Sequence, residues 1–146
     1  MKKLLSDGRT NAKTAKNLRK SLILYLAPFT QNSKGINVCA KATAGCIKGC
    51  LFEAGLASIY KSINAARVAR TEYMLHDRRT FINQVIDEIN RKAKRTDGEL
   101  AVRLNGTSDF KLVEMAIATG QTIAPNVIFY DYSKIPSKVG SRVLSS

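Results

Sequence analysis

The sequence lacks any apolar run that approaches the roughly 18 residues required by a membrane-spanning helix. Its N-terminus from Met1 to Leu5 is basic, but polar residues from Ser6 to Arg9 end the apolar stretch before the core of a signal peptide could form. We therefore expect a protein that stays in the cytoplasm and does not associate with a membrane.

Acidic residues are absent from Gly8 to Phe52, a stretch that holds eight Lys and Arg residues, and the whole chain has a formal net charge of +13. This imbalance favours a polyanionic partner. Nucleic acid is the commonest one, because each cation that neutralises a phosphate releases a counterion. The alternative is a lysine-rich face that is merely solvated. The residues predicted to contact nucleic acid are Lys13, Lys16, Arg19, Lys20, Lys41 and Lys48.

Cysteine is scarce, with three residues crowded into a stretch of twelve. An odd, crowded set is a poor disulfide framework and is more typical of metal ligands or reduced thiols. Three thiolates can hold three irons of an iron–sulfur cluster, or supply three zinc ligands with His76 as a distant fourth. They can also be buried thiols or redox groups. We expect Lys41 and Lys48 to lower the thiol pKa values. The predicted metal ligands are Cys39, Cys46 and Cys50.

A chain of 146 residues can bury the core of one domain without disulfide bonds. Short apolar runs predict strands at residues 21–26, 100–104 and 126–130, with helices between them. This order predicts right-handed crossovers and a small, mainly parallel sheet. We therefore expect one α/β domain over residues 1–146, with a basic N-terminal segment at residues 1–20.

Residues at helix ends define the expected helix boundaries. Asp77 is expected to cap a helix that buries Phe81, Ile82, Val85, Ile86 and Ile89. Asp109 is expected to cap a helix from Phe110 to Thr119, which Gly120 closes. An earlier helix is expected to bury a stripe formed by Leu56, Ile59, Ile63, Ala66 and Tyr73.

Three polar segments follow the predicted strands: the cysteine loop from Cys39 to Cys50, the loop from Arg103 to Asp109, and Asp131 with Tyr132. In parallel α/β sheets, ligands bind beyond the carboxyl ends of the strands. We therefore expect the three segments to meet at one edge of the sheet and to form a site there.

The segment Arg103-Leu-Asn-Gly-Thr-Ser-Asp109 is dense in hydrogen-bonding groups. Gly106 would allow a close approach of the backbone. A turn that caps the next helix explains part of the composition, because Thr, Ser and Asp are common caps. It does not explain the Arg and the Asn before the cap. The residues predicted to bind a ligand are Arg103, Asn105, Thr107, Ser108 and Asp109.

The order of short motifs along the chain resembles the gene product 88 family of bacteriophages and mobile elements. The resemblance covers nearly the whole chain and implies a phage origin, hence a bacterial host, rather than a defined activity. The motifs are Asn11-Ala-Lys-Thr14, Leu24-Tyr-Leu-Ala-Pro28, Gly35-Ile-Asn-Val-Cys39, Gly45-Cys46, Cys50-Leu51, Ala65-Ala-Arg67, Asp77-Arg78, Arg103-Leu-Asn-Gly-Thr-Ser-Asp109 and Tyr130-Asp-Tyr132.

Two further expectations follow from these resemblances. Family members continue beyond the Tyr-Asp-Tyr motif, and a β/α barrel takes about 250 residues, so the chain is expected to resemble part of such a barrel. The cysteine loop also resembles that of radical S-adenosylmethionine enzymes. Its cysteines are separated by six and then three residues, a different spacing, which favours a cluster over S-adenosylmethionine chemistry.

The leading functional hypothesis is a phage-type protein that binds an iron–sulfur cluster, or zinc, beside a polyanion-binding surface. The alternative is a binding module without chemistry, which grips nucleic acid or inhibits a host machine. Whether the chain catalyses a reaction stays open. Three predicted strands leave sheet edges uncovered, and exposed edges favour pairing. We therefore expect a homodimer or a complex with a host protein.

Overall fold

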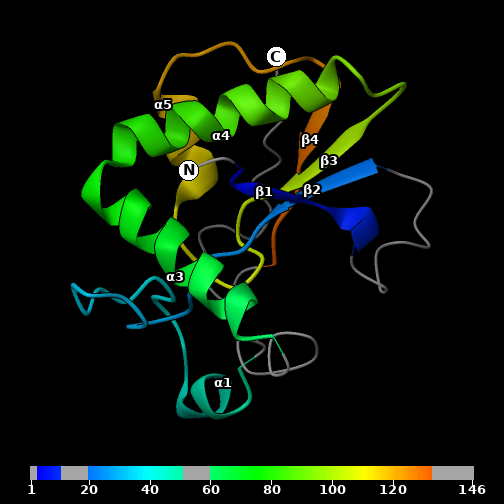
Figure 1. Ribbon diagram of the computed structural model, residues 1–146. Helices are drawn as coiled ribbons and strands as arrows, with labels where there is room; N and C mark the ends of the chain where they lie inside the picture. Colours follow the sequence, from blue (N-terminus) through cyan, green and yellow to red (C-terminus); the bar gives the residue numbers. More distant parts are fainter. Residues whose placement is uncertain (1–2, 11–19, 51–59, 133–146) are drawn as a thin grey trace.

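The computed structural model describes residues 3–10, 20–50 and 60–132, which form a sheet with helices packed on one side (Figure 1). The elements are β1 (Leu5–Asp7), a 3-10 turn η1 (Gly8–Thr10), β2 (Lys20–Leu24), α1 (Ala44–Lys48), α3 (Lys61–His76), α4 (Arg78–Ala93), β3 (Leu100–Arg103), α5 (Leu112–Ala118) and β4 (Val127–Phe129). No helix in these ranges is long and apolar enough to cross a membrane.

The sheet has four strands in the order β1-β2-β3-β4. Strands β2, β3 and β4 are parallel to their neighbours, whereas β1 is antiparallel to β2. The predicted mainly parallel sheet is confirmed, and the three predicted strands lie where the apolar runs placed them. The resemblance to part of a β/α barrel is not confirmed, because the described strands form a mixed sheet.

Strand β1 was not predicted from the sequence. It has only three residues, too few to show an alternating pattern, and distant partners hold it in place. The Glu88 carboxylate of α4 accepts hydrogen bonds from the backbone N–H groups of Leu4 and Leu5, both at 2.9 Å. This carboxylate therefore fixes the start of β1 under α4.

The two faces of the sheet differ in their cover. Leu22 and Leu24 of β2 and Leu100 and Val102 of β3 share one face by strand alternation, and all four belong to the main core under the helices. On α4, the predicted inward stripe is buried as expected: Phe81, Ile82, Val85, Ile86 and Ile89. The opposite face carries Arg103, so the helices leave this side chain outside the core.

Helices α3 and α4 meet at Asp77, which ends the first helix and caps the second. Its carboxylate accepts a hydrogen bond from the backbone N–H of Thr80 at 3.1 Å, which confirms the predicted cap. Hydrogen bonds with the side chain and the backbone of Thr80 lower the carboxyl pKa. Tyr73 of the predicted earlier stripe packs edge-on against Phe81, with ring centroids 5.4 Å apart. Ile63, Ala66 and Tyr73 of the stripe are only half-buried, and Leu56 and Ile59 lie outside the described ranges.

The prediction that Asp109 caps a helix starting at Phe110 is wrong. Helix α5 begins at Leu112, and the residue at its cap position makes no side-chain hydrogen bond. Asp109 instead pairs with Cys39 in an isolated parallel bridge, which uses its backbone before the helix starts. Gly120 follows the helix with a φ of 71°, and its N–H bonds to the carbonyl of Ile117, so its expected closing role is confirmed.

Candidate functional site

The three polar segments that follow β2, β3 and β4 meet at one edge of the sheet, as their topology predicts. Asn105 Nδ2 donates to the Asp131 carboxylate at 2.6 Å. The Asp109 N–H donates to the carbonyl of Val38, beside the bridge with Cys39. This edge, at the carboxyl ends of the parallel strands, is the candidate site.

Asn105 organises the loop after β3 from within. Its side chain is 1% exposed, and Nδ2 also donates to the Phe110 carbonyl at 2.9 Å. Its Oδ1 accepts from the Ser108 hydroxyl at 2.9 Å and from the Phe110 N–H at 3.0 Å. These bonds fill both donors and both lone pairs of the amide. In this arrangement Asn105 and Ser108 shape the site rather than face a ligand.

The next two residues fasten the same loop to the end of β2. The Gly106 N–H donates to the carbonyl of Leu24 at 2.9 Å. A Cβ at this position would lie 2.7 Å from that carbonyl oxygen, so the expected close backbone approach is confirmed. The Thr107 hydroxyl donates to the carbonyl of Leu26. The loop is therefore a fixed platform beside Arg103.

Two arginines lie against tyrosine rings at this edge. The guanidinium carbon of Arg103 is 4.8 Å from the centroid of Tyr132, and that of Arg67 is 5.3 Å from the centroid of Tyr25. Both distances are within the range of cation–π attraction. Tyr130 lies edge-on to Tyr132, and burial raises its pKa while the charge of Arg103 opposes the rise. The edge therefore combines cations with aromatic rings.

Burial makes these cations costly to keep charged. Arg67 is 9% exposed, and burial lowers its pKa, against opposing effects of Tyr25 and Cys50. Burial also lowers the pKa of Arg70, one helical turn further along α3, and the charge of Arg67 adds to that effect. The Arg103 Nε atom is buried and has no hydrogen-bond partner among the described residues. A cation in this setting favours an anionic neighbour.

The Cys39 thiol is held at the junction of two loops. Its Sγ accepts from the Phe29 N–H at 3.4 Å and donates to the Thr107 carbonyl at 3.8 Å. Burial raises its pKa more than the backbone hydrogen bonds lower it, and the charges of Cys50 and Asp109 add to the rise. The expected lowering by lysine is therefore wrong for this thiol, because burial dominates.

The three cysteines are not joined by disulfide bonds, and they occupy different settings. The charge of Cys50 acts on the pKa values of both Cys39 and Arg67. Cys46 lies on α1, where its Sγ accepts from the Thr43 hydroxyl at 3.1 Å. Within the described residues, no group of three or more His, Cys, Asp or Glu side chains is arranged to hold a metal ion.

The gene product 88 family model matches residues 3–145. The chain belongs to the gene product 88 family. This confirms the resemblance seen in the motifs and makes the chain a bacteriophage protein. The search of curated proteins and the search of solved structures each gave no match to the chain.

In this gene product 88 chain, the three predicted nucleic-acid contacts that lie in the described residues are spread along the chain and lie at different ends of β2. Lys20 opens β2, whereas Lys41 and Lys48 lie in the loop beyond the other end of that strand. The cysteine loop meets the loop after β3 and does not fold back along β2. The other predicted contacts, Lys13, Lys16 and Arg19, lie outside the described residues.

Tyr25 and Arg67 are the site residues that were not predicted in this family member. Both occur in its family motifs, but neither was assigned a role. A signal for Arg67 was present, since it falls between Ile63 and Met74 at helical spacing, on the side of α3 that turns inward. An arginine at a buried position of an amphipathic helix indicates a special environment. Tyr25 directly follows a buried strand and carried no comparable signal.

Proposed function

We propose that this protein binds a nucleotide at the carboxyl edge of its sheet, with the phosphate on the arginines and the base on the tyrosines. The observation that carries the proposal is Arg103. Its Nε is buried without a hydrogen-bond partner among the described residues, and its guanidinium lies over Tyr132 at the end of a parallel strand. Open α/β sheets bind their ligands at this edge.

The chemistry of both side-chain types fits such a ligand. An arginine presents a planar fork of donors that matches a phosphate in two parallel hydrogen bonds. Tyr132 is 72% exposed, so its ring offers area on which a base can stack. Arg67 brings a second cation to the same edge, over Tyr25. Phosphate and ring recognition would therefore lie side by side.

The surrounding loop supports the proposal by holding Arg103 in place. Asn105 ties the loop after β3 to Asp131 beyond β4, and Gly106 ties it to the end of β2. A ligand would then meet a site that needs little ordering, which lowers the entropy lost on binding. In this role Asn105, Thr107 and Ser108 are positioning residues, and Arg103 contacts the ligand.

Isothermal titration calorimetry with ATP, AMP and inorganic phosphate tests the proposal on the full chain. Both nucleotides should bind, and inorganic phosphate should bind more weakly because it lacks a base. Arg103→Lys keeps the charge but loses the fork, and should weaken nucleotide binding by about tenfold or more, the worth of a charged hydrogen bond. Arg79→Gln, at an exposed position in the first turn of α4, is the matched control.

Two results would overturn the proposal. One is the absence of binding for both nucleotides at millimolar concentration. The other is an Arg103→Gln variant that binds as tightly as the Arg79→Gln control, since a site without Arg103 would then be equally competent. DNA strands that carry a terminal phosphate distinguish a free nucleotide from the end of a nucleic acid.

A thiolate-bound metal, either an iron–sulfur cluster or zinc, is the second candidate. The observation that favours it is that Cys50 and Cys39 lie close enough to influence each other electrostatically. Cys46 would have to leave Thr43 to join them. Helix α1 has five residues and none of them is buried, so a shift of this helix would disrupt little packing. The three cysteines would supply thiolates, and His76 is too remote in the chain to be assigned as a fourth ligand.

Anaerobic purification followed by metal analysis tests this candidate. A bound cluster gives absorbance near 400 nm, and zinc gives a stoichiometric metal content. Changing Cys39, Cys46 and Cys50 together to Ser should abolish either signal, whereas Arg103→Gln should leave it intact. A parent protein that is colourless and metal-free after anaerobic purification would rule the candidate out.

A further inference from the structure

A hollow of about 310 Å³ lies on the side of the sheet that α4 covers, between β1 and the C-terminal part of that helix. Leu5 and Leu22 form its apolar floor, and four cations surround it. The cations come from two parts of the chain that are far apart in sequence: Lys3, Arg91, Lys92 and Arg95. This is a different place from the site at the carboxyl edge.

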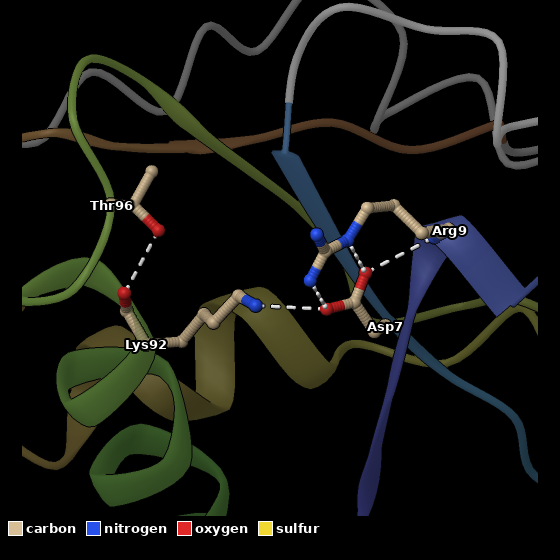
Figure 2. A network of polar contacts seen from close by, with 4 residues as sticks. All are labelled: Asp7, Arg9, Lys92 and Thr96. Carbon is tan, nitrogen blue, oxygen red and sulfur yellow. Dashed lines mark hydrogen bonds and ion pairs between the residues drawn. The ribbon is translucent and has the colours of Figure 1, made fainter.

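The acidic groups at the hollow are already engaged within the protein. The Asp7 carboxylate accepts from Arg9 at 3.1 Å and from Lys92 at 2.8 Å, and these partners hold its pKa far below the usual range (Figure 2). Glu88 accepts from the backbone N–H groups at the start of β1. Both carboxylates therefore already have partners within the protein: two cations for Asp7 and two backbone N–H groups for Glu88.

The remaining cations line the hollow without an acidic partner among the described residues. Among the ion pairs between described residues, none involves Lys3, Arg91 or Arg95. Arg91 lies in the last turn of α4 and Arg95 in the turn that follows the helix, and because both line the hollow their like charges repel each other. An anion placed between them and Lys3 would relieve this repulsion. The hollow is therefore electrostatically suited to a phosphate.

Positive charge continues from the hollow along β2. Lys20 and Leu22 are two residues apart on this strand, so their side chains point to the same face of the sheet. Lys20 lies at the N-terminal end of β2, beyond the floor residue Leu22. An extended anion that occupied the hollow could also contact Lys20. A single phosphate group could not contact the hollow and Lys20 at the same time.

We propose that this hollow binds the phosphate backbone of nucleic acid through Lys3, Arg91 and Arg95. The protein would touch phosphates and not bases, so the surface carries little sequence preference. Each neutralised phosphate releases a counterion, and binding weakens as salt rises. The cations of this surface come from the N-terminus, from α4 and the turn after it, and from Lys20 of β2.

Fluorescence anisotropy of the full chain with a labelled DNA duplex, over a series of salt concentrations, tests the assignment. The triple variant Lys3→Gln, Arg91→Gln, Arg95→Gln should flatten the dependence of log K on log salt by about 0.9 for each phosphate that is no longer neutralised. The control triple is Lys61→Gln, Arg79→Gln, Lys111→Gln. It removes the same charge from exposed positions away from the hollow and should leave the slope nearly unchanged.

Equal flattening by both triples would overturn the proposal, because net charge alone would then explain the binding. The absence of any duplex binding at low salt would overturn it as well. Single-stranded DNA should show the smaller change of about 0.7 per phosphate. Arg103→Gln in the same assay should keep the parental slope, so failure of this proposal and failure of the nucleotide site are separately visible.

Discussion

The two charged regions of the molecule handle their ions in opposite ways. On the helix-covered side, Asp7 lies between two cations and Glu88 accepts hydrogen bonds from backbone N–H groups, so the acids are matched inside the fold. At the carboxyl edge, Arg67 and Arg103 lie against tyrosine rings, and the buried Nε of Arg103 has no hydrogen-bond partner among the described residues. The first arrangement satisfies its charges within the chain, whereas the second leaves the Arg103 Nε without such a partner.

Asn105→Ala should cause the largest change, because it removes the amide that organises the carboxyl edge. The variant lacks four hydrogen bonds of a side chain that is 1% exposed, which should lower the free energy of unfolding by about 3 kcal/mol. Urea denaturation measures the decrease. Ser108→Ala removes one of these bonds and should cost about 1 kcal/mol. Equal decreases in the two variants would contradict the central role of Asn105.

Arg103→Met tests most directly whether the cation at the carboxyl edge lacks the partners that Asp7 has on the helix-covered side. A buried Nε without a hydrogen bond costs about 1–3 kcal/mol, whereas the cation–π attraction to Tyr132 returns about 0.5–1 kcal/mol. The variant should therefore raise the free energy of unfolding by about 1 kcal/mol in the absence of ligand. Thermal and urea denaturation report the change. A clear decrease in stability would show that Arg103 is satisfied within the fold, as Asp7 is.

Asp7→Asn should have an effect of similar size that depends on pH. The carboxyl pKa is lower in the folded than in the unfolded state, so its stabilisation is present above the unfolded value of about 4 and is lost as the pH falls below it. Arg9 is largely exposed, so solvent screens the pair, and the decrease in stability at neutral pH should be about 1 kcal/mol. Denaturation curves of parent and variant should converge in acid; a constant gap would contradict the ion-pair assignment.

The smallest expected effect concerns the reactivity of Cys39 rather than stability. Its pKa is raised by burial, so at neutral pH it should react with iodoacetamide more slowly than a model thiol. The rate should rise only above the ordinary thiol pKa of about 8.5. Mass spectrometry of labelled peptides follows the modification, with Cys39→Ser confirming the assignment. Rapid labelling at neutral pH would show that lysine charge, and not burial, controls this thiol.

Local patterns in the sequence were sufficient for most of the fold. Apolar runs placed β2, β3 and β4, helical spacing placed α4, and Asp77 was a correct cap. Parallel topology alone then brought three loops to one edge. These inferences succeeded because each depends on neighbours along the chain or on the general geometry of parallel sheets.

The features that were missed depend on interactions between distant residues. Strand β1 is held by Glu88, more than eighty residues away. The start of α5 is shifted because Asn105 donates to the carbonyl of Phe110, the acceptor that a helix starting at this residue would use. The pKa of Cys39 depends on burial, which charges nearby in sequence do not reveal. Spatial partners of this kind become visible only when the chain is folded.

Asp77 is the single residue that connects two long helices, the two arms of this part of the fold. Helices α3 and α4 have sixteen residues each, so each arm is about 24 Å long. In Figure 1 the two helices diverge from the point where they meet; Arg67 lies near the middle of α3, and Arg91 lies in the last turn of α4. A change of about 5° in the angle at Asp77 displaces a far end by about 2 Å. The distance between Arg67 and Arg91, one cation from each region, therefore depends on the geometry at Asp77.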